Sequence, residues 1–214
     1  MNQSGNINAN QLLRVARINP NSRVLGPGAR AVIWFHGCSR NCPGCIAHSM
    51  NSSREFHFFL PSDLASEVLK DPSIHGITIS GGEPFEQDIS ALREFMAIVH
   101  SAQKSIICYT GLKYETILTD PEKRTLLDMI DLLIDGEYQE ENNNGSPLRG
   151  SDNQRFIFLS DRFAEEKDMM LNQCREIECD IGLNNTLEIT GIPERGFLQK
   201  IEKELNARGL EVLW

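Results

Sequence analysis

Short apolar runs alternate with amphipathic stretches along this chain, and this alternation constrains the fold more than any other feature. Strands are expected where β-branched and apolar residues cluster, at 31–35, 76–80, 105–110, 131–135, 155–160 and 186–190. Helices are expected between and after them, at 61–71, 88–102, 121–129, about 162–174 and 194–208. Strand and helix in alternation predict an α/β fold with mostly parallel strands, in a sheet that is open or partly closed into a barrel.

The length of the chain favours one domain. At 214 residues, of which 40% are hydrophobic, it can bury one sizeable core and is short for two. We therefore expect a single domain over 1–214, with a polar N-terminal arm (1–25) that frays at its tip and then packs against the sheet. A long polar loop is expected at 139–154, and a C-terminal extension covers about 157–214.

Charge and hydropathy exclude some classes of protein. The first thirty residues hold no apolar stretch like a secretory signal, and no run reaches the ~18 apolar residues of a membrane span. We therefore expect a cytoplasmic protein without a membrane partner. A net charge of −9 argues against general nucleic-acid binding, which needs clustered Lys and Arg, although a local basic pocket stays possible.

Three of the six cysteines lie close together. Cys38, Cys42 and Cys45 have the spacing C-x3-C-x2-C and directly follow the expected strand 31–35. Ligands bind beyond the carboxyl ends of strands in α/β folds, and three thiolates can wrap one soft metal centre. Structural zinc would take a fourth ligand from His36 or His48. A [4Fe–4S] cluster held by three cysteines would leave one iron open to a ligand. Spacing alone leaves both alternatives open.

The other cysteines are scattered. Cys108 lies inside an apolar run and is interpreted as a small buried hydrophobic residue. Cys174 and Cys179 could help to hold a second cluster, but two ligands are too few for one, and their role stays open.

A second motif follows the expected strand 76–80. Gly81 and Gly82 would let the backbone approach a ligand closely, and the Glu83 carboxylate can accept hydrogen bonds from an ammonium group. A Gly-Gly-Glu sequence alone is weak evidence, because glycine-rich strand ends are often plain turns. Beside a three-cysteine loop from the neighbouring strand it is much stronger. The two motifs together resemble those of radical S-adenosylmethionine enzymes.

In that superfamily the three cysteines hold a [4Fe–4S] cluster, and the amino and carboxylate groups of S-adenosylmethionine bind the fourth iron. The resemblance implies a partial (β/α)6 barrel, with Cys38, Cys42 and Cys45 as metal ligands. It also implies cofactor contacts from glycines and from the ends of two strands, namely Gly44, Gly81, Gly82, Glu83, Thr110 and Gly111. Gly37 and Gly44 would bring backbone amides to the cluster sulfurs, although loop geometry explains them equally well, and a plain turn is an alternative for Thr110 and Gly111.

One branch of the superfamily fits best. Many members carry an aromatic residue before the third cysteine, and the replacement by Gly44 is familiar among activating enzymes of anaerobic ribonucleotide reductase. Six blocks resemble that branch in order, namely "GPGAR" (26–30), "WFHGCSRNCPGC" (34–45), "GITISGGEPFEQ" (76–87), "YTG" (109–111), "IDLLIDGEY" (130–138) and "LRGSDNQRF" (148–156).

The branch implies reductive cleavage of S-adenosylmethionine to a 5′-deoxyadenosyl radical, with electrons from a donor such as flavodoxin or ferredoxin. The radical would then take a hydrogen atom from a glycine of a glycyl-radical enzyme. The alternative is a stand-alone radical enzyme that modifies a small molecule or peptide beneath its C-terminal extension. If the extension lies at the far edge of the sheet, the face beside Gly81 stays open and the activating role is favoured.

Other polar residues have weaker interpretations. Asp135 and Glu137 could form a pair of carboxylates for acid–base chemistry, although no second catalytic motif accompanies them. Arg149, Asn153 and Arg155 could bind a carboxylate or a partner at the mouth of the site. No catalytic residue is assigned beyond the cluster and cofactor ligands.

Overall fold

The computed structural model describes residues 11–48, 50, 55–181 and 186–209. Its centre is a seven-stranded sheet in the order β3-β1-β2-β4-β5-β6-β7. The strands are β1 (Leu13–Ser22), β2 (Arg30–Phe35), β3 (His57–Phe59), β4 (Gly76–Gly81), β5 (Ser105–Thr110), β6 (Leu132–Asp135) and β7 (Arg155–Phe158).

Parallel pairing is confined to the centre of the sheet. Strands β2, β4, β5 and β6 are parallel neighbours, whereas β1, β3 and β7 pair antiparallel. Within the described residues β3 and β7 are the two ends of the strand order, so the pairing is that of an open sheet. The radical-enzyme barrel stays a prediction.

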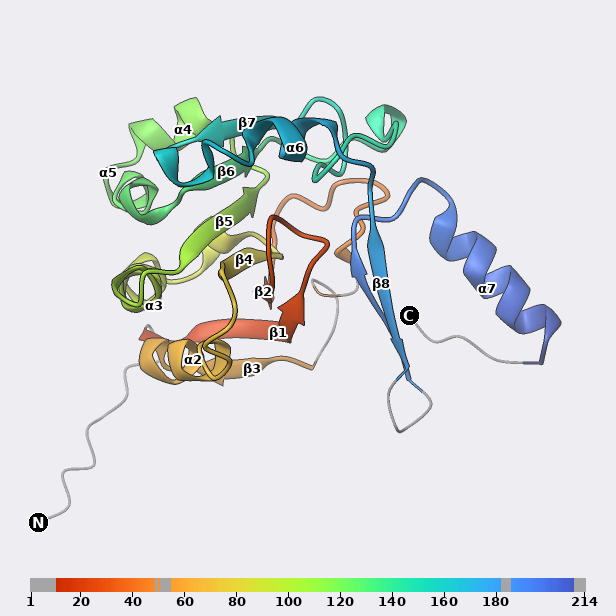
Figure 1. Cartoon of the computed structure of the whole chain (residues 1–214), viewed down its shortest axis with the longest axis horizontal. Helices are drawn as coiled ribbons and strands as arrows, with labels where there is room; N and C mark the ends of the chain where they lie inside the picture. The colour runs from red at the N-terminus through yellow and green to blue at the C-terminus, as the bar shows by residue number, and fades with distance from the viewer. Residues whose placement is uncertain (1–10, 49, 51–54, 182–185, 210–214) are drawn as a thin grey trace, which may run out of the picture.

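Helices connect the parallel strands and cover one face of the sheet (Figure 1). They are α2 (Pro61–Val68), α3 (Ile89–Ser101), α4 (Tyr114–Thr119) and α5 (Pro121–Arg124), with 3-10 turns η2 (Pro84–Glu86) and η3 (Leu127–Met129). The Asp88 side chain caps α3 by accepting a hydrogen bond from the Ala91 N–H at 2.8 Å. As its periodicity predicts, α3 buries Leu92, Phe95, Met96 and Val99 in the main core.

All six predicted strands are present, and a helix or 3-10 turn lies in each predicted helical range. Strands β1 and β3, helix α4 and a strand over Ile177–Ile181 were not predicted. β1 lies in the expected N-terminal arm, where Leu13 and Val15 are buried while Arg14 between them is only half-buried. Most of the arm that the structure describes is therefore a strand of the sheet.

The C-terminal extension adds a separate unit. After η4 (Glu140–Asn142), η5 (Asp161–Phe163) and α6 (Lys167–Asn172), strands β8 (Ile177–Ile181) and β9 (Leu187–Gly191) form a two-stranded sheet, and α7 (Phe197–Ala207) follows. Arg17 of β1 donates hydrogen bonds to the Ile189 carbonyl at 3.1 Å and the Glu188 carboxylate at 2.8 Å. The hairpin thus lies against β1 rather than beyond the edge strand β7, with α7 outside it (Figure 1). Residues 210–214, the end of the extension, lie outside the described residues.

The part of the chain that the structure describes contains no helix with the length and apolarity to cross a membrane.

Candidate functional site

The carboxyl ends of the parallel strands meet around one cavity of about 140 Å³. The loop after β2, the end of β4 and the end of β5 all contribute to its wall. Eight of the nine predicted site residues line it, namely Cys38, Cys42, Cys45, Gly81, Gly82, Glu83, Thr110 and Gly111. The ninth, Gly44, lines a neighbouring cavity.

Close backbone packing joins the Gly-Gly-Glu motif to the start of the cysteine loop. Gly82 N–H donates to the Phe35 carbonyl at 2.7 Å, and Glu83 N–H donates to the Gly37 carbonyl at 2.8 Å. A Cβ atom on Gly82 would lie 2.2 Å from the Gly37 oxygen, so only glycine fits there. Because Gly82 has no side chain, the end of β4 can pack against the backbone at Gly37, and this packing sets the position of Glu83.

The Glu83 carboxylate is buried and well hydrogen-bonded. One oxygen, Oε1, accepts from the Thr110 hydroxyl at 2.7 Å and the Phe85 N–H at 3.1 Å. The other, Oε2, accepts from the Gly111 N–H at 2.8 Å and lies 3.5 Å from Arg40 Nε. Burial raises the pKa of Glu83, while the hydrogen bonds from Thr110, Phe85 and Gly111 act in the opposite direction. The motif thus places a carboxylate at the floor of the cavity beside the cysteine loop.

Arg40 is a site residue that the sequence analysis missed. It lies between the first two cysteines of the loop, and its guanidinium bonds Glu137 at 2.8 Å as well as approaching Glu83. The side chain is only 20% exposed. Arg40 therefore ties the cysteine loop to the ends of β4 and β6. A cation between two cysteines is the only local signal for it, because both of its partners are distant in sequence.

The cysteine loop turns sharply. Cys45 N–H donates to the Cys42 carbonyl at 3.2 Å, and Gly44 has a φ of +69°. A Cβ atom on Gly44 would lie 2.7 Å from the Glu140 carboxyl carbon, but that side chain is partly exposed and can move, so the positive φ is what favours glycine here. Burial raises the pKa values of the Cys38 and Cys45 thiols. A bound metal centre would favour their thiolate forms.

The donor set fits an iron–sulfur cluster, because three thiols line one cavity and cysteine thiolates are the ligands of such clusters. Among the residues that the structure describes, no group of three or more His, Cys, Asp and Glu side chains is gathered to hold a single metal ion. His36, one of the two zinc candidates, stacks on Phe56 with ring centroids 4.1 Å apart. The other, His48, lines the neighbouring cavity.

The weaker candidates have partners of their own. Asp135 is buried and accepts hydrogen bonds from Tyr114 N–H at 2.7 Å and Arg155 Nε at 2.9 Å. Glu137 pairs with Arg40 instead, so the two carboxylates have different cationic partners although both line one cavity. Arg155 also bonds Glu115.

The polar turn before β7 is held by hydrogen bonds from its side chains to nearby backbone carbonyls. Arg149 donates to the Gln154 carbonyl and lies over the Phe156 ring. Asn153 donates to the Glu137 carbonyl at 2.8 Å.

The other cysteines lie apart from the cysteine loop. Cys108 is buried as interpreted, while Cys174 and Cys179 are exposed.

Comparison with protein families bears directly on this cysteine loop. Residues 24–157 match the family described as the 4Fe-4S single cluster domain. The chain belongs to that family. The match includes the cysteine loop, the Gly-Gly-Glu motif and strands β2, β4, β5 and β6, and it ends within β7. The hairpin β8–β9 and α7 follow the 4Fe-4S single cluster domain.

Similar proteins bear one name, anaerobic ribonucleoside-triphosphate reductase-activating protein. The chain is 34% identical to that of Enterobacteria phage T4 over 145 residues, which are 65% of this chain and 90% of the relative. It is 29% identical to that of Salmonella typhimurium over 151 residues, 66% of this chain and 96% of the relative. It is 34% identical to that of Vibrio cholerae over 139 residues, 61% of this chain and 88% of the relative. These alignments leave about a third of this chain unmatched.

Proposed function

We propose that this protein is a radical S-adenosylmethionine enzyme whose [4Fe–4S] cluster is held by Cys38, Cys42 and Cys45. The observation that carries the proposal is the meeting of these three thiols with Glu83 in one cavity. The family match contains one other cysteine, Cys108, and that thiol is buried in the main core. Three cysteine ligands would leave one iron of the cluster open to the cofactor. The partial (β/α)6 barrel of the superfamily is proposed with it, on the parallel strands β2, β4, β5 and β6.

Bound together, the cluster and S-adenosylmethionine would supply reductive cleavage to methionine and a 5′-deoxyadenosyl radical. An external donor such as flavodoxin or ferredoxin would provide the electron. The residues of this chain would bind S-adenosylmethionine, orient it and shield the radical from side reactions. Glu83 would receive the ammonium group of S-adenosylmethionine, since a buried carboxylate with an ammonium partner makes a strong, charge-assisted contact.

Several backbone and side-chain groups would support that contact. Thr110 and Gly111 hold the Glu83 carboxylate in place through the bonds described above. Arg40, anchored by Glu137, lies beside one carboxylate oxygen, so Glu83 would be shared between its guanidinium and the ammonium group. Gly81 and Gly82 bring the strand end close to the cysteine loop. These groups would place the cofactor between the thiols and the end of β5.

The substrate is proposed to be a glycine residue of an anaerobic ribonucleoside-triphosphate reductase. The names of the relatives support this, because the chain covers 88% to 96% of the lengths of the three relatives described above. The activating protein would remove a hydrogen atom from the glycine and leave a glycyl radical on the reductase. The alternative remains a stand-alone enzyme that modifies a small molecule or peptide.

The test mixes anaerobically reconstituted, reduced protein with S-adenosylmethionine and the anaerobic reductase encoded in the same genome. We expect 5′-deoxyadenosine by chromatography and a glycyl doublet by electron paramagnetic resonance. A reductase variant with its radical-site glycine replaced by alanine is the control and should give no doublet. Formation of 5′-deoxyadenosine without a doublet, although the two proteins bind each other, would favour the stand-alone enzyme.

A further inference from the structure

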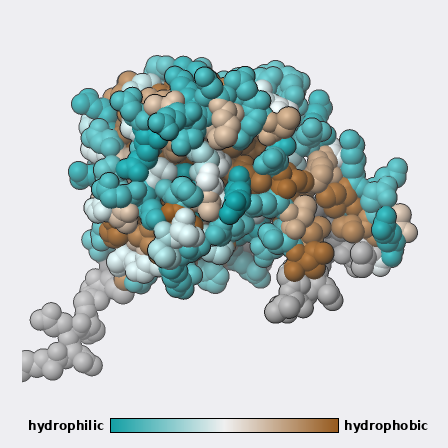
Figure 2. Space-filling model, viewed as in Figure 1, coloured by the Kyte–Doolittle hydropathy of each residue, from teal (hydrophilic) through white to brown (hydrophobic). Residues whose placement is uncertain are grey.

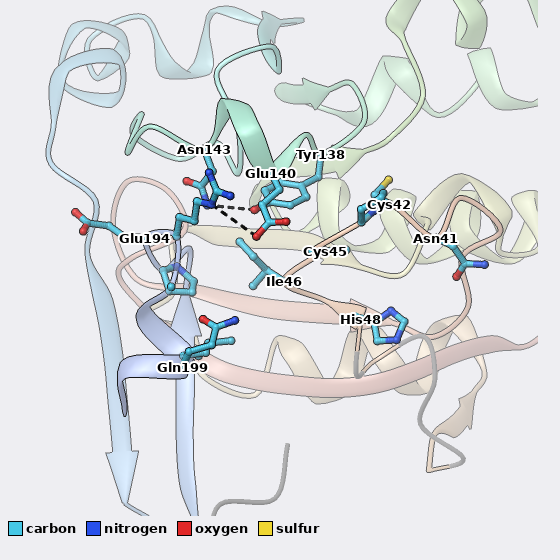
Figure 3. A pocket seen from close by; sticks show the side chains of 16 residues that line it. Asn41, Cys42, Cys45, Ile46, His48, Tyr138, Glu140, Asn143, Glu194 and Gln199 are labelled. Carbon is cyan, nitrogen blue, oxygen red and sulfur yellow. Dashed lines mark hydrogen bonds and ion pairs between the residues drawn. The ribbon is translucent and has the colours of Figure 1, made fainter. Parts of the chain in front are cut away.

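The residues that follow the β8–β9 hairpin form a wall beside the cysteine loop. Ile192 lines the Glu83 cavity itself. Residues 193–196, Leu198 and Gln199 line a second cavity of about 430 Å³, which the cysteine loop also lines (Figure 3). We call residues 192–199 the extension wall. They lie outside the 4Fe-4S single cluster domain, which ends at residue 157.

The two cavities are neighbours. Both are lined by Cys42, Cys45, Ile46 and Tyr138, so a group in the larger cavity lies against the same two cysteines as a group in the Glu83 cavity. Figure 3 shows Cys42, Cys45 and Tyr138 on one side of the larger cavity and Glu194 and Gln199 on the other. The larger cavity is therefore an approach to the site that the extension helps to build.

Arg175 fastens the extension wall to the polar loop. Its half-buried guanidinium donates to the Asn143 amide oxygen at 2.7 Å and to the Pro193 carbonyl at 3.1 Å. It also donates to the Ser146 carbonyl at 3.0 Å and the Gly150 carbonyl at 3.2 Å. One cation thus joins two segments that are distant in sequence. The wall is a built part of the fold, held at its start by one hydrogen bond from a charged group that is itself fixed to the polar loop.

The chemistry of the larger cavity suits a polypeptide segment. The amide side chains of Asn41 and Gln199 can both donate to and accept from a peptide backbone, while that of Asn143 is held by Arg175 and Tyr138. Ile46 and Leu198 add apolar contact.

The charges of the larger cavity argue against a phosphate ligand. Among its described lining residues Arg195 is the only Lys or Arg, and it lies 3.8 Å from the Glu140 carboxylate. Phosphate recognition favours clustered basic groups and bidentate Arg, whereas this cavity presents both signs of charge.

The surface of the extension also favours a macromolecule over a small ligand. Ile181 and Leu187 are cross-strand partners on the hairpin, and they are 82% and 39% exposed. Figure 2 shows apolar side chains gathered over the hairpin and α7. Exposed apolar groups that gather in this way are typical of protein-binding surfaces.

We propose that the extension wall is a docking site for an extended segment of the partner reductase, which passes through the larger cavity toward the Glu83 cavity. This inference rests on the proposed function. It assigns to the extension the recognition of the partner, while the 4Fe-4S single cluster domain carries the chemistry.

The test compares two substitutions on the same helix. Leu198→Asp places a charge in the cavity, in the first turn of α7 where an acidic residue suits the helix dipole. Lys203→Asp is the matched control on the exposed surface of α7. Affinity for the purified anaerobic reductase is measured by anaerobic biolayer interferometry on cluster-loaded protein. We expect at least tenfold weaker binding for Leu198→Asp, about 1.4 kcal/mol, and wild-type binding for Lys203→Asp.

A second variant covers the case in which Leu198→Asp does not fold. Gln199→Arg changes an exposed side chain of the wall, and we expect it to weaken binding several-fold. Wild-type affinity in the folded Leu198→Asp and Gln199→Arg variants would overturn the inference. A wild-type protein that does not bind the reductase would overturn it as well.

The outcome is separable from that of the proposed function. Cleavage of S-adenosylmethionine by the wild-type protein, with dithionite and without reductase, tests the radical chemistry alone. Absence of cleavage together with the expected affinity pattern would refute the chemistry and leave the docking site supported. Cleavage together with wild-type affinity in the Leu198→Asp and Gln199→Arg variants would support the chemistry and refute the docking site.

Discussion

The Glu83 carboxylate accepts a hydrogen bond from the Thr110 hydroxyl at 2.7 Å. The two residues stand at the ends of strands that are parallel neighbours in the sheet, β4 and β5. The bond therefore fixes the orientation of a buried carboxylate relative to the sheet, and through Gly82 relative to the cysteine loop. This arrangement makes Glu83 a sensitive probe of the site.

The stability of the metal-free protein should depend on the ionisation of Glu83. Because burial raises its pKa above the ordinary value of 4.5, Glu83 binds a proton more readily in the folded state than in the unfolded chain. Its contribution to stability is fully present below pH 4.5 and is lost as the pH rises through the raised pKa. Glu83→Gln should remove this component, so the difference in unfolding free energy between wild type and variant should change over that window. Urea titrations at a series of pH values would measure it, and a constant difference would contradict the raised pKa.

Removing the same carboxylate should weaken S-adenosylmethionine binding. We expect Glu83→Ala to cost roughly 2–5 kcal/mol, because it would leave the ammonium group without its charged partner. Equilibrium binding to the cluster-loaded, unreduced protein gives the affinity. Glu115→Ala removes an exposed carboxylate that pairs with Arg155, and it serves as the control with unchanged affinity. Equal affinities in wild type and Glu83→Ala would exclude the ammonium contact.

The ligand set predicts which cysteines the cluster needs. Replacing any one of Cys38, Cys42 and Cys45 by Ala should abolish the broad visible absorption of reconstituted protein, since three ligands are what an open-iron site requires. Cys179→Ala, at an exposed position on β8, should retain the iron and the spectrum. If the triple Ala variant kept both, other ligands would have to hold the metal.

Gly82→Ala should destabilise the fold. The added methyl group would lie 2.2 Å from the Gly37 carbonyl oxygen, and backbone cannot yield as a flexible side chain can. We expect a loss of about 3 kcal/mol in unfolding free energy, toward the upper end for overpacking. Gly145→Ala meets no atom within 4 Å but has a φ of +92°, so it should cost about 1 kcal/mol through backbone strain alone. Equal losses would show that the approach of Gly82 to Gly37 is not tight.

Arg175→Ala should loosen the extension wall. The substitution would remove the bonds to Asn143, Ser146, Gly150 and Pro193, and a charged hydrogen bond typically contributes about 1.5–3 kcal/mol. Faster hydrogen exchange is expected in β9 and at the start of α7, together with faster limited proteolysis between them. Arg208→Ala, at the exposed end of α7, should leave both rates unchanged. Equal exchange in the two variants would mean that other contacts hold the wall.

Much of the sheet and most of the site could be predicted because the signals are local. Apolar runs mark β2, β4 and β5, and the motifs at their carboxyl ends come together because parallel strands end at the same edge of a sheet. Strand β1 was not predicted because half-buried Arg14 and Arg17 interrupt its apolar residues. The packing of Arg14 and Arg17 depends on elements far away in sequence.

Long-range packing explains the rest. Arg40 pairs with Glu83 and Glu137, which lie in different parts of the sequence, and no periodicity encodes that meeting. The place of the hairpin is set by contacts of Arg17 and Asn19 with β9. Nothing within the extension itself shows that it would reach the cysteine loop.

The larger cavity has one wall from residues 41–48 and another from residues 193–199, so its two sides are synthesised at very different times. All seven strands of the main sheet precede residue 159, and the extension wall leaves the ribosome only after they do. Until then the cysteine loop is uncovered on the side of the larger cavity. A newly made chain thus completes its main sheet before the extension wall narrows the approach to Cys42 and Cys45, so the larger cavity is the last part of the site to take shape.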